Sequence, residues 1–389
     1  MTMVSVAVFA TDTMTAALNT ISTSLNAEMN KTQLIIVSLL ITYGVLQIPC
    51  GLLADRYGRK PVIIAGLVAF LIGSVITIVA DQIDTLLAGR VIQGIGSATS
   101  AVLSRAMARD LSSGAEFNRL MSTLIAATAF TAVVGPVLGG VVVSVLNWKA
   151  LVILIGLVGL VALLLSLKLP ETLPEKTSQS VMNQVKRSVG LYIRTPLTIW
   201  ATALLAIHFF GFMTLLANFS LVTESVYSYS PIVTGAIFST GVFIYFLTTL
   251  YSRSLTRHKS AIELLGMSMY CYILASIAMA WLYISGTDNF IFLCLGILPF
   301  MIAFGFVFSN TTTLSLQNIP HSRGFIAGLV GTFQISISSL GAYYSSLIYD
   351  GTAKAIILII GCCSVLMILI YSLGILLLPE GRADAAKNT

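Results

Sequence analysis

Charged residues are scarce in this sequence: Asp, Glu, Lys and Arg together make up 9% of 389 residues. Soluble globular domains carry charge at about a quarter of their positions, so this scarcity excludes that class. Apolar residues make up 57%, and the mean hydropathy is +0.95. The apolar runs are long and uninterrupted, whereas barrel strands are about 10 residues long and alternate in polarity. The composition predicts an all-α polytopic membrane protein.

Cysteine and histidine are also rare, with five and three residues. The cysteines lie in apolar runs, without a Cys-x-x-Cys pair, and are interpreted as packing residues. The sequence contains no phosphate-binding G-x-x-x-x-G-K-[ST] loop, no metal-ligand spacing and no convincing set of nucleophile and base. We therefore expect no cofactor, no metal and no enzymatic activity. The net charge of +6 is scattered over short loops, so we expect no nucleic-acid partner.

Twelve apolar runs are long enough to cross a bilayer. The predicted spans are 3–20, 34–53, 62–80, 85–107, 118–142, 150–168, 197–219, 232–252, 262–284, 290–313, 325–348 and 355–378. The polar segment 169–195 is the longest connection and separates two sets of six. The predicted organisation is a six-helix bundle at 1–168, a linker at 169–195, a second bundle at 196–378 and a tail at 379–389.

The distribution of positive charge predicts the orientation. Seventeen of the 21 Lys and Arg residues fall in the tail and in the loops that follow the second, fourth, sixth, eighth and tenth spans. Three fall in the loops on the opposite side of the membrane, and Arg90 lies within a span. Positive residues mark cytoplasmic loops, so both termini and the linker are predicted to be cytoplasmic. No Lys or Arg precedes Lys31, so the first run is expected to remain as a helix instead of being a signal peptide. A short first span or a true start upstream of Met1 would both fit.

The segment GLLADRYGRKP, from Gly51, follows the second span, and a weaker basic counterpart, YSRSLTRHK, follows the eighth. This repetition suggests a transporter with two related halves. Glycines allow close approach and a sharp turn, and an aspartate can bond backbone amides. A plain basic anchor would need neither. The predicted conformational residues of this loop are Gly51, Asp55, Arg56, Gly58, Arg59 and Lys60.

This loop resembles the signature between helices 2 and 3 of the major facilitator superfamily. LAGRVIQGIGSA, which contains Arg90, resembles the helix 4 motif of that superfamily, and AVVGPVLGG resembles the helix 5 motif of its proton-driven exporters. TDTMTAALNTI, from Thr11, is similar to the first helix of the Bcr/CflA drug antiporters but departs from it at Thr13, Thr15 and Ala16. The resemblance implies the major facilitator fold, with twelve helices in two pseudo-symmetric six-helix bundles.

Asp12 and Arg90 are the predicted proton-coupling pair. Asp12 sits about nine residues into the first span, roughly 13 Å deep at about 1.5 Å per residue, where a carboxylate is costly unless it is paired, solvated or protonated. A carboxylate that moves between apolar and cationic surroundings can bind and release a proton. The alternative for Asp12 is a helix-end residue at the interface, and Arg90 could instead extend to the outer interface.

His208 lies in the middle of the seventh span and is a third candidate for proton coupling, because the unperturbed pKa of histidine is near 6.5. A satisfied packing residue is the alternative. Gly135, Pro136, Gly139 and Gly140 are predicted conformational residues: proline bends a helix, and glycine permits close helix packing. A purely structural bend is the other interpretation.

Polar and aromatic side chains within the spans are candidates for a substrate cavity, because amides and tyrosines offer hydrogen bonds without fixed charge. Hydrogen bonding between helices is an equally good interpretation for each of them. These residues are Tyr43, Gln47, Asn218, Tyr245, Asn310, Gln334 and Tyr343.

The predicted function is proton-driven efflux of a drug-like compound or secreted metabolite by alternating access across a bacterial inner membrane. The expected partners are a small-molecule substrate, protons and the lipid bilayer, and the family resemblance implies a monomer. Sodium coupling is not excluded by composition. An importer or uniporter of the same fold is the nearer alternative, against which the helix 5 motif argues. A non-transporting membrane receptor is more distant.

Overall fold

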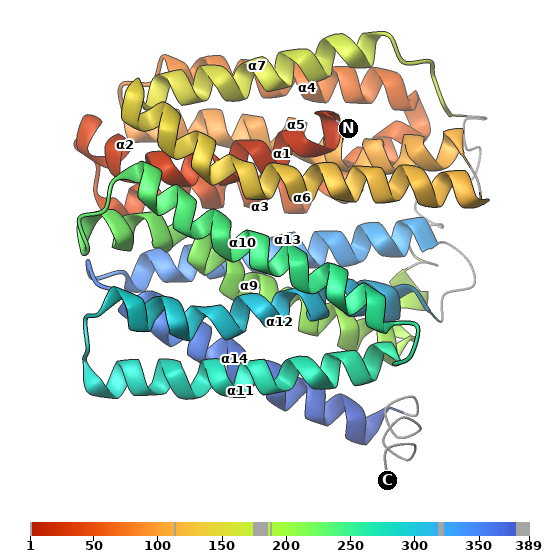
Figure 1. Cartoon of the computed structure of the whole chain (residues 1–389). Helices are drawn as coiled ribbons and strands as arrows, with labels where there is room; N and C mark the ends of the chain where they lie inside the picture. The colour runs from red at the N-terminus through yellow and green to blue at the C-terminus, as the bar shows by residue number, and fades with distance from the viewer. Residues whose placement is uncertain (1, 113, 174–185, 187–188, 318–322, 379–389) are drawn as a thin grey trace. The chain divides into compact units, whose positions relative to one another are not determined.

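The structure of the protein is a computed structural model that describes residues 2–112, 114–173, 186, 189–317 and 323–378 (Figure 1). Within these residues every long regular element is a helix, and twelve spans are long and apolar enough to cross a membrane, which confirms the predicted number. The helices are α1 (Thr2–Asp12), η1 (Met14–Ala17), α2 (Leu18–Ser24), α3 (Met29–Tyr57), α4 (Arg59–Ile78), α5 (Ile83–Leu111), α6 (Gly114–Val145), α7 (Trp148–Leu167), α9 (Pro196–Ser225), α10 (Pro231–Leu255), α11 (Ala261–Ser285), α12 (Phe290–Gln317), α13 (Arg323–Ile348) and α14 (Lys354–Leu377).

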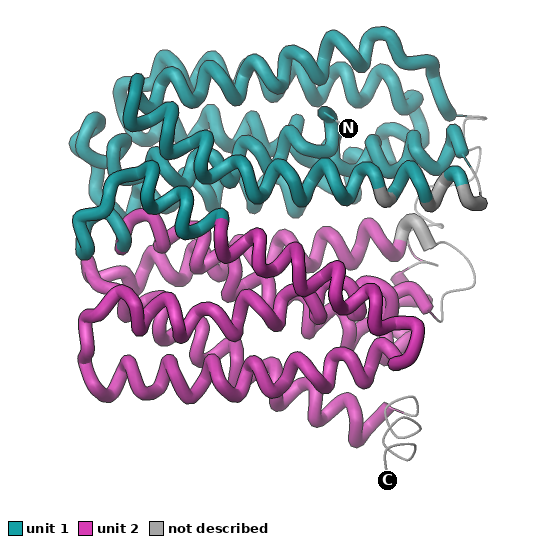
Figure 2. The backbone as a smooth tube through the Cα atoms, viewed as in Figure 1, with its two compact units in different colours: residues 1–185, 223–239 teal, residues 186–222, 240–389 magenta. Residues whose placement is uncertain are grey.

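The chain forms two compact units (Figure 2). The first comprises residues 1–185 and 223–239, and the second comprises residues 186–222 and 240–389. The start of α10 therefore groups with α1–α7, and the rest of α10 groups with α11–α14. The predicted tail at 379–389 and most of the predicted linker lie outside the described residues.

The first predicted span is interrupted instead of continuous. α1 ends at Asp12, a short 3₁₀ segment covers Met14–Ala17, and α2 continues from Leu18. The hydroxyl of Thr13 donates to the carbonyl of Phe9 at 2.5 Å, and the hydroxyl of Thr15 donates to the carbonyl of Asp12 at 2.7 Å. Threonine side chains compete in this way with regular backbone bonding, and a 3₁₀ segment within a span often marks a functional hinge.

Closely packed glycines join α4 to α5 in the first unit. A Cβ atom built on Gly73 would lie 2.6 Å from the carbonyl oxygen of Gly89, and one built on Gly96 would lie 2.5 Å from that of Gly66. Small residues of this kind allow membrane helices to pack backbone against backbone. The α4–α5 contact therefore holds α5, which carries Arg90, at a fixed distance.

Gly73→Ala tests this contact. The added methyl group meets backbone atoms of Gly89 and Gln93, which no rotamer change can move, and overpacking of this kind costs about 1–3 kcal/mol. We expect a lower Tm for the detergent-solubilised variant than for the wild type.

Gly328→Ala is the matched control, because a Cβ atom there meets no atom of the described residues within 4 Å. In the interior of a helix, alanine is favoured over glycine by about 1 kcal/mol, so the control should equal or exceed the wild-type Tm. Equal Tm values for the two variants would contradict close α4–α5 packing.

Candidate functional site in the first unit

Asp12 is buried at the end of α1, with 8% of its surface exposed. A Cβ atom built on Gly135 of α6 would lie 3.3 Å from the Cβ of Asp12. Among the residues that the structure describes, the Asp12 carboxylate forms no ion pair within 4 Å. The structure thus places this carboxylate in the interior of the unit, at the interruption of the first span, without a cation in direct contact.

Arg90 is fully buried and bonds to three neutral acceptors. Its Nε donates to the carbonyl of Ile35 on α3 at 3.1 Å, and one Nη donates to the carbonyl of Ala10 on α1 at 3.0 Å. The other Nη donates to Oε1 of Gln93, one turn further along α5, at 2.8 Å. Arg90 therefore turns inward and does not reach the outer interface. The predicted pair does not meet directly: Arg90 holds the backbone two residues before Asp12.

Gln93 and Ser74 extend this arrangement to α4 and were not among the predicted site residues. The Nε2 of Gln93 donates to the hydroxyl of Ser74 at 2.9 Å, and that hydroxyl donates to the carbonyl of Phe70 at 2.8 Å. A buried polar group is costly unless it is hydrogen-bonded, and this chain of bonds satisfies the amide. The sequence signal is a glutamine three residues after the arginine, which lies on the same helix face.

The four predicted residues of α6 lie on two neighbouring faces of the helix. Gly135 contacts Asp12 at the end of α1, and the backbone of Thr13, directly after α1, lies too close to Gly139 to admit a side chain. Gly140 likewise contacts the backbone of Pro231 at the start of α10, and the carbonyl of Pro136 contacts Gly235. This segment is thus packed between two other helical segments of its own unit.

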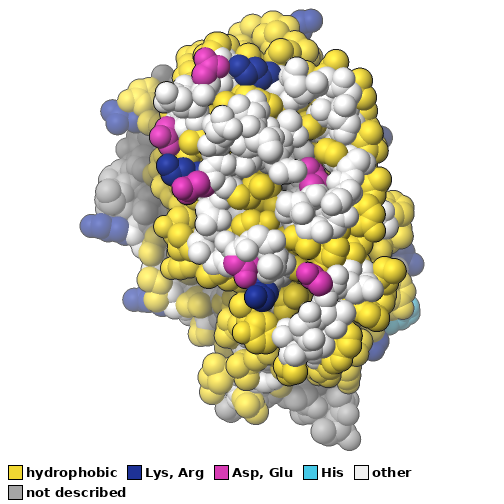
Figure 3. Space-filling model, turned by 90° about the vertical axis from the view of Figure 1, so that its left-hand side faces the viewer, with side chains coloured by type: hydrophobic (Ala, Val, Ile, Leu, Met, Phe, Trp, Pro, Cys, Tyr) yellow, Lys and Arg dark blue, Asp and Glu magenta, His cyan; other side chains and the backbone are white. Residues whose placement is uncertain are grey.

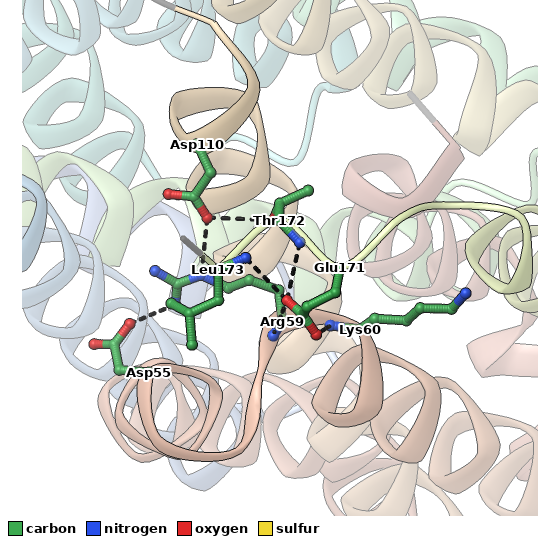
Figure 4. A network of polar contacts seen from close by, with 7 residues as sticks. All are labelled: Asp55, Arg59, Lys60, Asp110, Glu171, Thr172 and Leu173. Atoms are coloured by element: carbon green, nitrogen blue, oxygen red, sulfur yellow. Dashed lines mark hydrogen bonds and ion pairs between the residues drawn. The ribbon is translucent and has the colours of Figure 1, made fainter. Parts of the chain in front are cut away.

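The turn between α3 and α4 is held by charged side chains (Figure 4). Gly58 follows α3 with a φ of 110°, a conformation that favours glycine. Arg59 pairs with Asp55 one turn earlier and with Asp110, near the end of α5, at 3.1 Å. This single guanidinium therefore joins the end of α3 to the end of α5.

Glu171, beyond the end of α7, caps the start of α4 (Figure 4). Its carboxylate accepts backbone N–H groups from Arg59 at 2.9 Å, Lys60 at 3.1 Å, Thr172 at 2.9 Å and Leu173 at 3.0 Å. A carboxylate at a helix start satisfies N–H groups that have no partner in the helix. Burial acts to raise the pKa of Glu171, but these four N–H groups outweigh burial, and its pKa lies below the ordinary value.

Gly51 and Arg56 of α3, the remaining predicted residues of this segment, take no part in this network of charged side chains. Gly51 faces Val102 of α5, with a built Cβ at 3.6 Å. Arg56 is exposed, and its guanidinium lies 5.3 Å from the centre of the Tyr57 ring. Glu171 and Asp110 were missed by the sequence analysis, although the acidic residue directly after Pro170 was a usable signal.

His208 lies in the second unit, fully buried among aromatic rings. Its Nδ1 is 2.5 Å from the hydroxyl of Tyr272 on α11, and its ring stacks on Phe300 of α12 with 4.3 Å between centres. Within the described residues its Nε2 has no hydrogen-bond partner. The ring thus packs between aromatic side chains with one of its two nitrogens bonded, and its role in proton coupling stays a prediction.

Two predicted cavity amides of the second unit form bonds between helices. Asn218 donates to the hydroxyl of Ser345 on α13 at 2.7 Å, and Asn310 donates to that of Ser252 on α10 at 2.9 Å. Tyr245 stacks on Phe304 with 4.3 Å between ring centres.

The other predicted cavity residues differ in exposure. Gln47 is 3% exposed and Tyr343 is 38% exposed. Tyr43 and Gln334 are half-buried. Their role in substrate binding stays a prediction.

Comparison with known proteins assigns these motifs to a family. The sequence profile of the Major Facilitator Superfamily matches residues 1–342. The chain belongs to the Major Facilitator Superfamily.

Relatives within the superfamily have names that refer to drug resistance. The bicyclomycin resistance protein homolog of Haemophilus influenzae is 25% identical over 338 residues, covering 82% of this chain and 81% of that protein. Multidrug resistance protein MdtL of Shigella dysenteriae is 26% identical over 361 residues, covering 87% and 84%. These relatives agree with the resemblance to the Bcr/CflA branch.

Solved structures confirm the major facilitator fold. The D-xylose-proton symporter matches with a TM-score of 0.76 at 15% identity, and the match covers 95% of each chain. At this identity the likeness shows the fold alone. As a member of the superfamily, this chain is a multi-pass transporter of the inner membrane, takes a small-molecule substrate and is not an enzyme.

Glu171→Gln tests the cap of α4 in this superfamily member. Because the pKa of Glu171 is lowered on folding, its carboxylate stabilises the protein at pH values above the ordinary pKa, 4.5, and this stabilisation is lost as pH falls through the folded value. We expect the variant to have a lower Tm than the wild type at pH 7, and the difference to shrink as the pH is lowered through 4.5.

Glu28→Gln is the control, because Glu28 precedes α3 but its side chain forms no cap bond. Its Tm should match the wild-type Tm at both pH values. A Glu171→Gln difference that persists unchanged at low pH would show that the charge of Glu171 does not stabilise the turn.

Proposed function

We propose that this transporter exports small organic molecules in exchange for protons and that Asp12 carries the proton. The observation that carries the proposal is the position of Asp12, a carboxylate with 8% exposure at the interruption of the first span. The drug-resistance names of the relatives support the direction of transport. Because a single chain contains both halves, we propose that it acts as a monomer.

Opposing influences act on the Asp12 carboxylate. Apolar surroundings and the negative end of the α1 dipole disfavour its charged form, while the positive charge of Arg90 favours it. Arg90 is tied to α1 through the carbonyl of Ala10. A small displacement of α1 against α5 would change this balance, and the proton affinity would follow. Such a group can take up a proton in one conformation and release it in another.

The interruption of the first span favours a proton over a sodium ion. Sodium is coordinated in other transporters by carbonyl groups of unwound helices. Here the carbonyl of Ala10 already accepts from Arg90, and that of Asp12 accepts from Thr15. A proton needs only the carboxylate itself.

The second unit favours apolar and aromatic compounds as substrates. The amides of Asn218 and Asn310 are already bonded to their neighbours, whereas Tyr245, Phe304 and Phe308 form adjoining aromatic contacts. Largely apolar pockets with few polar groups suit drug-like molecules.

Asp12→Asn tests the proposed proton carrier. Purified protein in weakly buffered detergent solution is titrated with a panel of lipophilic cations, neutral aromatic compounds and metal chelators, and proton release is followed with a pH indicator. We expect the wild type to release protons on binding at least one compound. Asp12→Asn should release less than about a tenth as much, because a carboxamide does not titrate.

Two control variants decide between carriers. Asp84→Asn makes the same chemical change at an exposed position at the start of α5 and should release protons like the wild type. His208→Gln should also retain release, because the ring is enclosed by Phe300 and Tyr272. Release that persists in Asp12→Asn and disappears in His208→Gln would transfer the role to His208 and reject our proposal.

We also propose that both termini lie in the cytoplasm. Figure 3 shows the end of the helices away from the linker, where acidic and basic side chains are interspersed. Exposed pairs there include Lys149 with Asp81 at 3.4 Å and Lys354 with Asp350 at 3.5 Å. Such pairs leave no excess of positive charge, as expected of an outer face.

Reporter fusions test this orientation. Green fluorescent protein fused after Thr389 should fluoresce, whereas alkaline phosphatase fused there should be inactive. Fusions after Thr287, between α11 and α12, should show the reverse pattern. Three spans, α12, α13 and α14, lie between Thr287 and Thr389, and an odd number of crossings places the two positions on opposite sides of the membrane. Active phosphatase at Thr389 would show that the C-terminus lies outside the cytoplasm, and would reject both the proposed orientation and the proposed direction of export.

A further inference from the structure

The segment of α6 from Gly135 to Gly140 contacts two different segments with two different faces. Residues four apart lie on one face of a helix, and successive residues are rotated by about 100°. Gly135 and Gly139 share one face, and Pro136 and Gly140 share the next. The structure gives each face its own partner within the first unit.

The face of Gly135 and Gly139 supports the interruption of the first span. A Cβ atom on Gly135 would lie 3.3 Å from the Cβ of Asp12 and 3.6 Å from the backbone nitrogen of Thr13. At Gly139 the nearest atoms are the carbonyl oxygen, carbonyl carbon and Cα of Thr13. Backbone atoms cannot rotate away as a side chain can, so this face determines how closely the Asp12 segment approaches α6.

The face of Pro136 and Gly140 supports the start of α10. Gly140 packs against the backbone of Pro231 and Ile232, and Gly235 packs against the carbonyl of Pro136. These contacts are reciprocal: each helix presents a glycine to a backbone carbonyl of the other. None of these closest contacts involves Asp12 or Thr13.

We propose that Gly135 and Gly139 are positioning residues for Asp12 that set the pH range of proton exchange, whereas Pro136 and Gly140 serve the separate contact with α10. This inference rests on the proposed function, in which Asp12 carries the proton. The contact of Gly135 with the Asp12 Cβ, combined with the backbone contact at Gly139, fixes the carboxylate relative to its surroundings. A methyl group added on this face would displace Asp12 and Thr13 relative to Ala10, whose carbonyl accepts from Arg90.

Few ionisable groups of the helices packed against α1 lie near Asp12. α1 contacts α3, α5, α6 and α7. Arg90 of α5 is the charged group bonded to α1. On α6, no ionisable side chain lies between Arg119 and the end of the helix at Val145. The others on these helices are Lys31, Tyr43, Cys50, Asp55, Arg56 and Tyr57 on α3, Asp84, Arg105, Arg109 and Asp110 on α5, Glu116 on α6 and Lys149 on α7.

Gly139→Ala and Gly140→Ala form a matched pair of variants. Each adds one methyl group to adjacent positions of the same helix, and each meets backbone atoms. The readout is the pH dependence of substrate-driven proton release by the full-length purified protein. We expect Gly139→Ala to move the pH midpoint by about 0.5 to 1 unit, the spread that protein environments impose on carboxylates. Gly140→Ala should keep the wild-type midpoint.

A second variant separates positioning from general damage. Gly135→Ala is the milder variant for the Asp12 face, because its nearest contact is 3.3 Å and needs only a small adjustment. If Gly139→Ala does not fold, Gly135→Ala carries the test and should shift the midpoint in the same direction but by less.

Equal midpoints in the wild type and both Asp12-face variants would overturn the inference, as would equal shifts in Gly139→Ala and Gly140→Ala. Either result, obtained with wild-type proton release that depends on Asp12, leaves the proposed function standing. Wild-type release that is independent of Asp12 would reject the proposed function first and the inference with it.

Discussion

A guanidinium buried without a carboxylate in contact is the constraint on which the first unit depends. Arg90 is fully buried, and its bonds go to the carbonyls of Ala10 and Ile35 and to the amide of Gln93. Removing a charge from water is expensive unless its donors are satisfied, so α1 and α3 have to turn backbone carbonyl groups toward the guanidinium at this depth. The close glycine packing of α4 against α5 holds the arginine in place while it does so. The interruption of the first span lies directly beyond the carbonyl that Arg90 holds.

The fold was predictable because the bilayer imposes strong rules on sequence. Helices of about 20 apolar residues are the economical way to satisfy backbone groups in hydrocarbon, and the twelve predicted spans correspond to the twelve observed. Helix ends were less accurate: α3 runs from Met29 to Tyr57, whereas the predicted span was 34–53. Polar and charged residues can extend a helix beyond the hydrocarbon, where hydropathy gives no signal.

The candidate site was predicted in its residues but not in its contacts. Asp12 and Arg90 were identifiable because ionisable groups within spans are rare, and the sequence suggested that they pair. The structure instead connects Arg90 to the backbone of α1, since a carbonyl two residues away can accept as a carboxylate can. The amides of Asn218 and Asn310 were ambiguous for the same reason: an amide looks identical in sequence whether it bonds a neighbouring helix or a substrate. Only spatial neighbours such as Ser345 and Ser252 distinguish the two.

Glycine carries information of a different kind, because its effect depends on what lies opposite the missing side chain. The Gly-Pro and Gly-Gly pairs of α6 read in sequence as one bending motif, yet adjacent residues of that motif face different segments. The two faces are rotated by about 100° from each other, so a methyl group at Gly139 meets the backbone of Thr13 whereas one at Gly140 meets the backbone of Pro231. A single substitution can therefore alter one of these contacts and leave the atoms opposite the other face unchanged. Position along one helix, and not a chain of charged residues, separates the contact with the Asp12 segment from the contact with α10.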